Sequence, residues 1–210
     1  MKIYCLDIHN SNLRKIKKLK YIPVGLGQDN FDSGWLRDNS GDNISKKNSF
    51  YGEYTFHYWL WKNELNKISN NEWLGFCAYR RFWSNKIDKF EINRLGDFLI
   101  DTPKEWEDKE IILGQDIFLN WKFSKIIKHG LKSLILNPKL ILKNNWNIKY
   151  HFDSFHGYGN LDKAINLLEK NDREDFRQFT INKNSYNRSS MFFCKSKKIM
   201  NEYYNTVFPW

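Results

Sequence analysis

The chain has only three cysteines in 210 residues, and no two of them are spaced as C-x-x-C. Cys5, Cys77 and Cys194 each lie in an apolar run, so we expect small buried side chains rather than metal ligands or disulfides. This usage is typical of a reducing compartment and favours a cytoplasmic setting. No run of about eighteen apolar residues occurs, so no spanning helix is expected. The short apolar stretch at the N-terminus is interrupted by Asp7, which argues against a signal peptide.

Motifs for common cofactors are missing as well. There is no G-x-x-x-x-G-K-[ST] and no G-x-G-x-x-G, and Gly25-Leu26-Gly27 alone predicts a turn. Residues 38–43 fail as a calcium loop because Gly41 stands at the wrong position and the terminal Glu is absent. The five histidines lack a zinc spacing. No D-x-D occurs, so a divalent metal, Mn²⁺ or Mg²⁺, stays open as a cofactor but no motif holds it.

The chain is basic, with a net charge of +10. Such an excess suits an anionic partner, namely nucleic acid, an anionic membrane surface or a phosphate-bearing substrate, while a composition rich in Lys, Asn and Ile explains much of it equally well. Nucleic acid is disfavoured because the aromatics concentrate in one predicted helix and no binding module is recognisable. Residues 120–146 predict short Lys-decorated helices, either ordinary surface helices or a face that makes peripheral contact with an anionic membrane.

Strands and helices alternate along the chain and predict an α/β fold in a single domain, residues 1–210. Apolar runs at residues 73–79 and 110–113 are typical of strands buried on both faces. The other predicted strands are residues 2–8, 21–27 and 189–194. The predicted helices are residues 48–68, capped by Asn48 and weakened by Gly52, with 161–170 and 197–207. Residues 28–43 predict a long loop and residues 172–184 a polar connection.

Residues 38–83 are the most informative segment. They read DNSGDNISKKNSFYGEYTFHYWLWKN and, after a short polar break, WLGFCAYRRFW, with seven aromatics between Phe50 and Trp61. Aromatic walls with a few fixed polar groups are typical of small-molecule pockets, and sugar rings suit such walls. Trp59 and Trp61 cannot both face a pocket from one helix, so at least one of them is expected in the core.

Arg80 and Arg81 follow a predicted buried strand, at the end where ligands gather in open α/β sheets. Guanidinium groups bind phosphate oxygens in a bidentate way, so the pair indicates a phosphate site. The alternative is an ion pair with acids such as Glu53 or Asp88. Glu53 and His57 lie four residues apart and suit acid–base roles; the alternatives are an acid favoured by the helix dipole and a packed filler.

His156 lies in a Gly-flanked loop, HFDSFHGYG, which predicts either a catalytic or hydroxyl-binding group or a plain turn. The two central motifs resemble the signature of bacterial capsular and exopolysaccharide-synthesis proteins, a family long carried as a domain of unknown function and regarded as glycosyltransferases. The blocks YIPVGLG, KYHFDSFHGYGNL and SSMFFCKSKKIMNEYY follow in the family's order. The chain departs from the family at Ala78, where His is usual, and at Ser190, where Asn is common. Matching positions are Asn43, Ser45, Asn48, Tyr51, Glu53, Thr55, Tyr58, Trp59, Trp61, Lys62, Asn63, Gly75, Cys77, Tyr79, Arg80, Arg81 and His156.

The resemblance implies a nucleotide-sugar-dependent glycosyltransferase with a GT-A-like (Rossmann-like) mixed sheet flanked by helices. Its acceptor would be a glycan or a lipid-linked acceptor, in the cytoplasm or at the inner membrane face. The alternative is a non-catalytic carbohydrate-binding module. The family's terminal helix goes on beyond Trp210, so we expect that the native chain continues or that this end docks on the body.

The residues themselves supply a mechanism to go with this resemblance. The arginine pair would neutralise the leaving diphosphate in place of a metal, and Asp42 or Glu53 would be the base. Catalytic residues are expected to be Asp42, Glu53, Arg80, Arg81 and His156. Donor-binding residues are expected to be Pro23, Val24, Gly25, Asn43, Ser45, Asn48 and Tyr79, and acceptor or sugar-binding residues Trp59 and Asn63.

Overall fold

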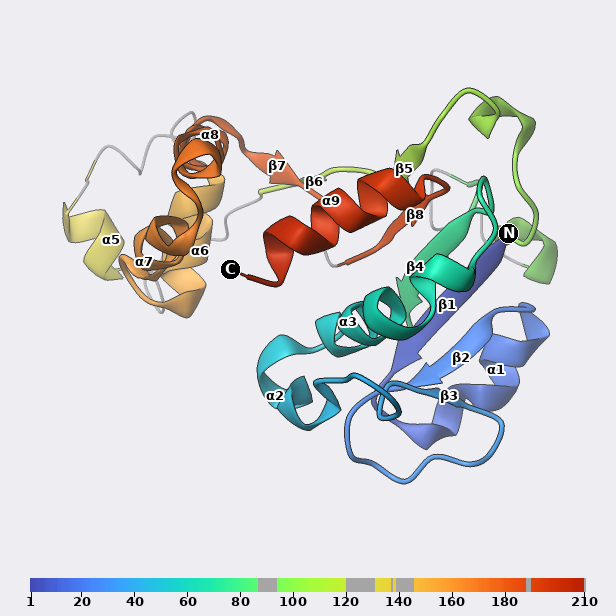
Figure 1. The fold of residues 1–210 in the computed structure, drawn as a ribbon. Helices are drawn as coiled ribbons and strands as arrows, with labels where there is room; N and C mark the ends of the chain where they lie inside the picture. The colour runs from blue at the N-terminus through green and yellow to red at the C-terminus, as the bar shows by residue number, and fades with distance from the viewer. Residues whose placement is uncertain (87–93, 120–130, 137, 139–145, 188–189, 210) are drawn as a thin grey trace. The chain divides into compact units, whose positions relative to one another are not determined.

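The structure, a computed structural model, describes residues 1–86, 94–119, 131–136, 138, 146–187 and 190–209 (Figure 1). The chain forms two compact units: residues 1–114 with 189–209, and residues 115–188. The first unit contains a six-stranded mixed sheet flanked by helices, so the predicted α/β class is confirmed. That the whole chain forms a single domain stays a prediction.

The sheet of the first unit has the strand order β3-β2-β1-β4-β8-β5. The first four strands in this order are parallel, and β8 pairs antiparallel with both β4 and β5. From β1 the chain moves outward to β2 and β3 and then returns to the other side of β1 for β4. The bounds are β1 Lys2–Asp7, β2 Ile22–Gly25, β3 Leu36–Arg37, β4 Leu74–Ala78, β5 Ile111–Leu113 and β8 Phe192–Cys194.

Alternating side chains of the central strands feed two hydrophobic clusters, one on each face of the sheet. Tyr4 and Leu6 pack with residues of α3 (Tyr54–Asn63) and α9 (Lys197–Val207), whereas Ile3 and Cys5 pack with residues of α1 (Leu13–Lys18). The period of two is that of a β-strand covered on both sides. The other helical segments of this unit are η1 Asn10–Asn12, η2 Ser45–Lys47, α2 Asn48–Tyr51, η3 Leu65–Lys67, η5 Leu95–Asp97 and η6 Lys104–Trp106.

The second unit is mainly helical and includes one two-stranded pair. Its elements are β6 Ile117–Phe118, α5 Leu131–Leu136, α6 Ile148–His156, α7 Asn160–Leu167, α8 Lys170–Asn182 and β7 Ser185–Tyr186. Asn147 caps α6 by accepting a hydrogen bond from the Tyr150 backbone N–H at 2.8 Å. Lys149 forms ion pairs with Asp153 and Asp162 and so ties α6 to α7.

Five expectations about the elements need correction. The helix expected at residues 48–68 is broken at Gly52, which has φ +53°, and Asn48 makes no side-chain capping bond. The expected connection at 172–184 is largely α8, and β3 lies inside the expected loop. β5 is an edge strand with Leu113 56 % exposed, so it is not buried on both faces.

The expectations about the cysteines and about six elements are confirmed. All three cysteines are free and buried, and β1, β2, β4, β8, α7 and α9 fall where they were expected. Near the chain end, the Phe208 ring stacks on Trp61 with centroids 5.5 Å apart. Most of the basic stretch at 120–146 lies outside the described residues. None of the helices that the structure describes combines the length and apolar content needed to cross a membrane.

Candidate active site at the carboxyl edge of the sheet

Three parallel strands end level with one another in the first unit. Asp7 of β1 lies opposite Gly25 of β2, and Leu6 lies opposite Ala78 of β4. β2 lies on one side of β1 and β4 on the other, so the order of the strands reverses at β1. This edge is therefore a topological switch point, where open α/β sheets bind their ligands. The segments that follow the three strands therefore gather at one place.

A cavity of about 380 Å³ lies at this edge. Its walls come from the segments that follow β1 and β2 and from the segment η2–α2. The lining residues are Ile8, His9, Leu26, Gly27, Gln28, Asp29, Ser45, Lys46, Asn48 and Ser49. Gly27 has φ +71°, and a Cβ there would stand 3.2 Å from the Asn48 Oδ1, so a glycine lets the two walls approach closely.

Hydrogen bonds hold the turn after β2 in place. The Arg37 Nη2 donates to the Gly27 carbonyl at 2.6 Å and the Nη1 donates to the Asp29 carbonyl at 2.9 Å. The Ser45 hydroxyl is 3.1 Å from the Asp38 Oδ1 and 3.3 Å from the Gly27 carbonyl, and it accepts from the Gln28 Nε2 at 3.3 Å. The turn and the segment 38–45 thus form one hydrogen-bonded frame.

Asp38 is fully buried inside this frame, and its Oδ2 has no hydrogen-bond partner within the described residues. A buried carboxylate oxygen without a hydrogen-bond donor lowers the stability of the fold. We therefore expect a donor for this atom other than the described protein atoms. The Asp38 Oδ1 accepts from the hydroxyl of Ser45, which lines the cavity.

A row of three side chains connects the ends of β1 and β4. The buried Asp7 accepts from the His9 backbone N–H at 2.9 Å and from the Asn12 Nδ2 at 2.9 Å, which fixes the turn after β1. The His9 ring meets the Tyr79 ring edge-on at 5.9 Å. The Arg80 guanidinium lies 4.8 Å from the Tyr79 ring centroid.

Arg80 and Arg81 are both exposed at the end of β4. The Arg81 backbone N–H donates to the Ala78 carbonyl at 2.8 Å, which forms a tight turn. In the part of the chain that the structure describes, the Arg80 side chain makes no hydrogen bond or ion pair, so its N–H groups are open to a ligand. The expected alternative was an ion pair of these arginines with Glu53 or Asp88. Within the described residues Arg80 makes no ion pair with Glu53, and Asp88 lies outside those residues.

The motif residues Asn43, Ser45 and Asn48 serve the frame. Asn43 accepts from the Ser45 backbone N–H at 3.3 Å and donates to the Gly41 carbonyl. The Asn48 Nδ2 donates to the Gly52 carbonyl at 2.9 Å and to the Thr55 hydroxyl at 3.1 Å. Ser45 and Asn48 also line the cavity, whereas Asn43 does not.

Asn63 and Asp42 lie toward the other end of α3. The Asn63 side chain bonds both backbone groups of Asp42, and the Tyr58 hydroxyl donates to the Asp42 carboxylate at 3.2 Å. Since α3 precedes β4, whose first residue pairs with the start of β1, its C-terminal end faces the amino edge of the sheet. About 13 Å of helix axis separates Asn63 from Tyr54 at 1.5 Å per residue, so Asp42 is held away from the carboxyl edge.

Trp59 is a core residue, which corrects its expected role in sugar binding. Its side chain is 5 % exposed, stacks on Phe56 at 5.6 Å and donates from Nε1 to the Ser40 hydroxyl at 3.1 Å. Pro23, Val24 and Gly25 are likewise buried inside β2, and the cavity is lined by the residues that follow them.

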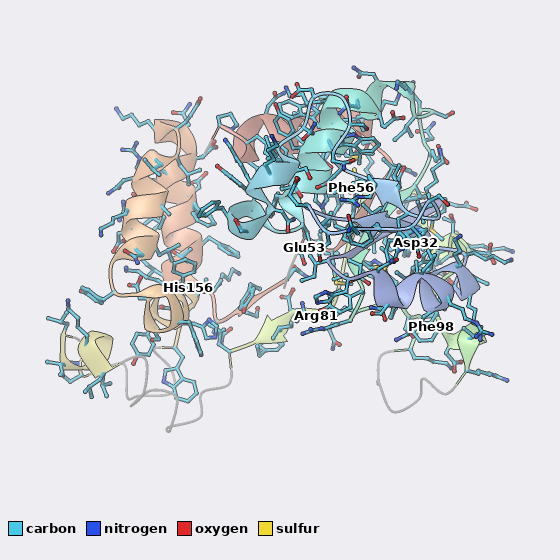
Figure 2. All side chains as sticks on the ribbon, turned by 90° about the horizontal axis from the view of Figure 1, so that it is seen from below. Asp32, Glu53, Phe56, Arg81, Phe98 and His156 are labelled. Carbon is cyan, nitrogen blue, oxygen red and sulfur yellow. The ribbon has the colours of Figure 1, made fainter. Side chains whose placement is uncertain are left out.

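Glu53 and His57 have different surroundings although they lie one turn apart. Glu53 is half-buried directly before α3, at the same edge of the sheet as Arg81 (Figure 2). His57 is fully buried between Phe76, at 4.4 Å, and Tyr204, whose hydroxyl is 3.0 Å from its Nδ1. Burial lowers the pKa of His57 to about 3, so the ring is neutral and acts as a packed filler.

His156 belongs to the second unit. It ends α6, is exposed and contacts the Phe152 ring at 4.4 Å. The predicted loop around it is therefore a helix end followed by two glycines with positive φ, Gly157 and Gly159.

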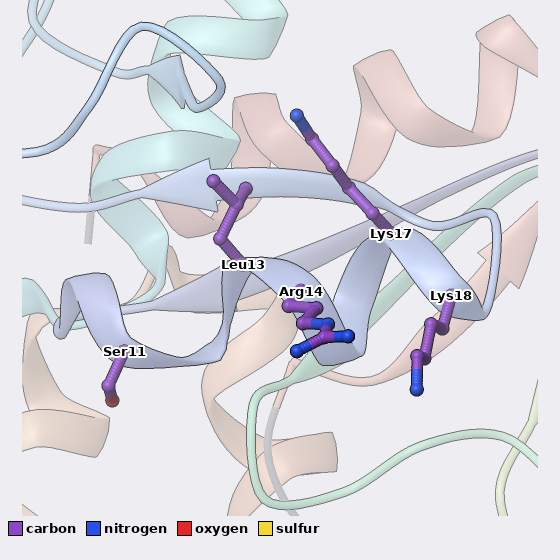
Figure 3. Close-up of a pocket in the computed structure, with 5 residues that line it drawn as sticks. All are labelled: Ser11, Leu13, Arg14, Lys17 and Lys18. Carbon is purple, nitrogen blue, oxygen red and sulfur yellow. The ribbon is translucent and has the colours of Figure 1, made fainter.

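A second hollow, of about 630 Å³, lies along α1 and is lined by Ser11, Leu13, Arg14, Lys17 and Lys18. Figure 3 shows Leu13 and Lys17 extending to one side of the helix and Ser11, Arg14 and Lys18 to the other. Because these cations do not converge on one point, the hollow supplies a positive surface rather than a formed phosphate pocket.

The sequence interpretation missed several residues at the carboxyl edge: Asp7, His9, Gln28, Asp38 and Lys46. Asp7 could have been found from the sequence, because a carboxylate at the end of an apolar strand often accepts hydrogen bonds from the turn that follows. Asp38 and Gln28 carried no local signal, since their positions depend on contacts between segments. Within the described ranges, no group of three His, Cys, Asp or Glu side chains is placed to hold a metal ion.

An α/β sheet of this order, with a cavity and two exposed arginines at its switch point, has its open groups where α/β sheets bind ligands. Over residues 2–209 the chain matches the family described as "Domain of unknown function (DUF4422)", and it belongs to that family.

A solved structure, the apo form of the bifunctional glycosyltransferase WbbM, is similar in fold. Its TM-score is 0.64 at 22 % identity, and the match covers 99 % of this chain but only 36 % of that chain. No curated protein matches the sequence.

Proposed function

We propose that this chain is a GT-A-like glycosyltransferase that moves a sugar from a nucleotide-sugar donor to a glycan or lipid-linked acceptor in capsular or exopolysaccharide synthesis. The observation that carries the proposal is the open guanidinium of Arg80, stacked on Tyr79 beside a cavity at the switch point of the sheet. The similarity in fold to a glycosyltransferase and the family resemblance support it.

The donor would bind with its nucleoside end in the cavity and its diphosphate toward Arg80 and Arg81. Stacking on Tyr79 holds the Arg80 plane, so its N–H fork is prepared for phosphate oxygens. The positive charge stabilises the diphosphate as it leaves with the electron pair of its bond to the sugar.

Glu53 is the stronger candidate for the base. It lies at the carboxyl edge, whereas Asp42 is held along α3 and engaged by Tyr58. In an inverting transfer, Glu53 takes the proton of the acceptor hydroxyl while the oxygen bonds to the anomeric carbon and the bond to the diphosphate breaks.

The location of the protein belongs to the same proposal. A cytoplasmic enzyme that meets a lipid-linked acceptor works at the inner membrane face, and a positive surface such as that of α1 suits contact with anionic lipids. This contact rests on charge alone.

The direct experiment is a thermal-shift screen of nucleoside diphosphates and nucleotide sugars, in EDTA and in Mn²⁺. We expect one nucleoside diphosphate to raise the melting temperature by about 5–10 °C at a hundredfold excess over its Kd. An equal shift in EDTA supports the arginine mechanism. No shift with any nucleotide would contradict the proposal and favour a carbohydrate-binding module.

A further inference from the structure

The short helix α2 exposes two large aromatic side chains. It buries none of its four residues, and Phe50 is 86 % exposed and Tyr51 48 % exposed. Single exposed apolar residues are common on protein surfaces. Here, however, two successive residues are both aromatic and exposed, and the preceding residues of the same helix, Asn48 and Ser49, line the cavity.

Space is free around Gly52, the residue that follows the two aromatics. At Gly52 no heavy atom from a more distant part of the chain lies within 4 Å of the place that a Cβ would take, so free space adjoins this residue. The next residue is Glu53, the candidate base. Within six residues the chain therefore runs from the cavity wall to two exposed rings, an open glycine and a half-buried carboxylate.

We propose that Phe50 and Tyr51 form the acceptor subsite, where one pyranose ring of a glycan stacks its apolar face and presents a hydroxyl to Glu53; this rests on the proposed function. Sugar rings have an apolar C–H face edged by hydroxyls, which suits an aromatic side chain with polar groups beside it. The Tyr51 hydroxyl is such a group, and the Lys47 Nζ, 6.0 Å from the Tyr51 ring centroid, is another.

The size of the patch favours a sugar over a protein partner. One aromatic side chain buries roughly 150–250 Å² at most, whereas a stable protein interface buries about 1,200–2,000 Å². Two exposed rings at successive positions therefore match one or two sugar units and are too small for a stable dimer. Trp59, which the sequence predicted as a sugar-binding residue, lies in the core, whereas the aromatic side chains of α2 are exposed.

Saturation-transfer NMR on the 210-residue protein tests the subsite. The probes are the methyl pyranosides of glucose, galactose, mannose and N-acetylglucosamine at millimolar concentration. We expect transfer to the ring C–H protons of at least one probe. Phe50→Ala and Tyr51→Ala should each weaken its binding about fivefold, the equivalent of about 1 kcal/mol for one aromatic contact.

Phe118→Ala is the matched control, because Phe118 is a 62 % exposed phenylalanine of the second unit. It should leave the signal unchanged. Both α2 variants should melt at the wild-type temperature, since α2 buries no residue. Equal transfer in the wild type and the α2 variants, or none in the wild type, would overturn the subsite.

Two further measurements distinguish the sugar subsite from the donor site and from a dimer contact. Nucleoside diphosphate shifts should be the same in Phe50→Ala as in the wild type; their absence from both would overturn the donor site while the sugar result still stands. Light scattering that shows a wild-type dimer lost in Phe50→Ala would identify a second copy as the occupant and so overturn the sugar subsite.

Discussion

Asn63 holds Asp42 from both sides of its backbone. The Asn63 Oδ1 accepts from the Asp42 N–H at 3.1 Å, and its Nδ2 donates to the Asp42 carbonyl at 2.8 Å and to the Trp59 carbonyl at 2.9 Å. Gly41, with φ +58°, lies so close that a Cβ there would collide with the Asn63 amide. A motif residue that was expected to bind sugar is thus committed to closing the loop onto α3.

Asn63→Ala should therefore lower stability. Loss of these hydrogen bonds is expected to reduce the free energy of unfolding by about 1–3 kcal/mol, measured by urea denaturation. Asn66→Ala is the control, because the exposed Asn66 side chain has no hydrogen bond within the described residues. Equal stability of both variants would show that the loop does not need the clamp.

His57 predicts a dependence of stability on pH. Burial lowers its pKa to about 3 in the folded state, against about 6.5 in the unfolded chain. The unfolded state therefore binds more protons below pH 6.5, and this stability is lost as the pH falls toward 3. Between pH 7.5 and 5.0 the loss is about 2 kcal/mol.

His57→Phe removes the titrating ring and keeps an aromatic filler. Between pH 7.5 and 5.0 its free energy of unfolding should fall by about 2 kcal/mol less than that of the wild type. Parallel denaturation series at several pH values measure the difference. Identical slopes in the two proteins would mean that His57 can be protonated within the fold.

Glu53 and Asp42 can be separated by matched amide variants. Glu53→Gln should slow transfer by about 10²–10⁴-fold because it removes the base, while nucleoside diphosphate binding stays at the wild-type level. Asp42→Asn should change the rate little, since Asp42 is held away from the carboxyl edge. Initial rates with the donor found in the screen measure both. The reverse result would assign the base to Asp42.

Elements with a clear period or cap could be predicted from the sequence. The helix expected at 197–207 has the bounds of α9, because Ser196 caps it and Met200 and Tyr204 recur on its buried side. α8 escaped notice because only Thr180 of its thirteen residues is buried, so it lacks an apolar stripe. The break at Gly52 depends on a positive φ that composition alone does not fix.

The site was predictable in its location but not in its parts. A buried strand followed by Arg80 and Arg81 correctly indicated the end of β4. However, periodicity cannot distinguish a pocket wall from the core, so Trp59 was given a role that the exposed Phe50 fits better. A family motif likewise does not separate residues that touch ligand from those, such as Asn43 and Asn63, that hold a loop.

The most direct test of the central claim is calorimetric titration of the screened nucleoside diphosphate into Arg80→Ala, Arg80→Lys and the wild type. Loss of a hydrogen bond to a charged group predicts at least about tenfold weaker binding by Arg80→Ala, and Arg80→Lys should lie between it and the wild type because it keeps the charge without the fork. Arg14→Ala, an exposed arginine of α1, is the control and should bind as the wild type does. Equal affinity in Arg80→Ala and the wild type would contradict a diphosphate site at the end of β4.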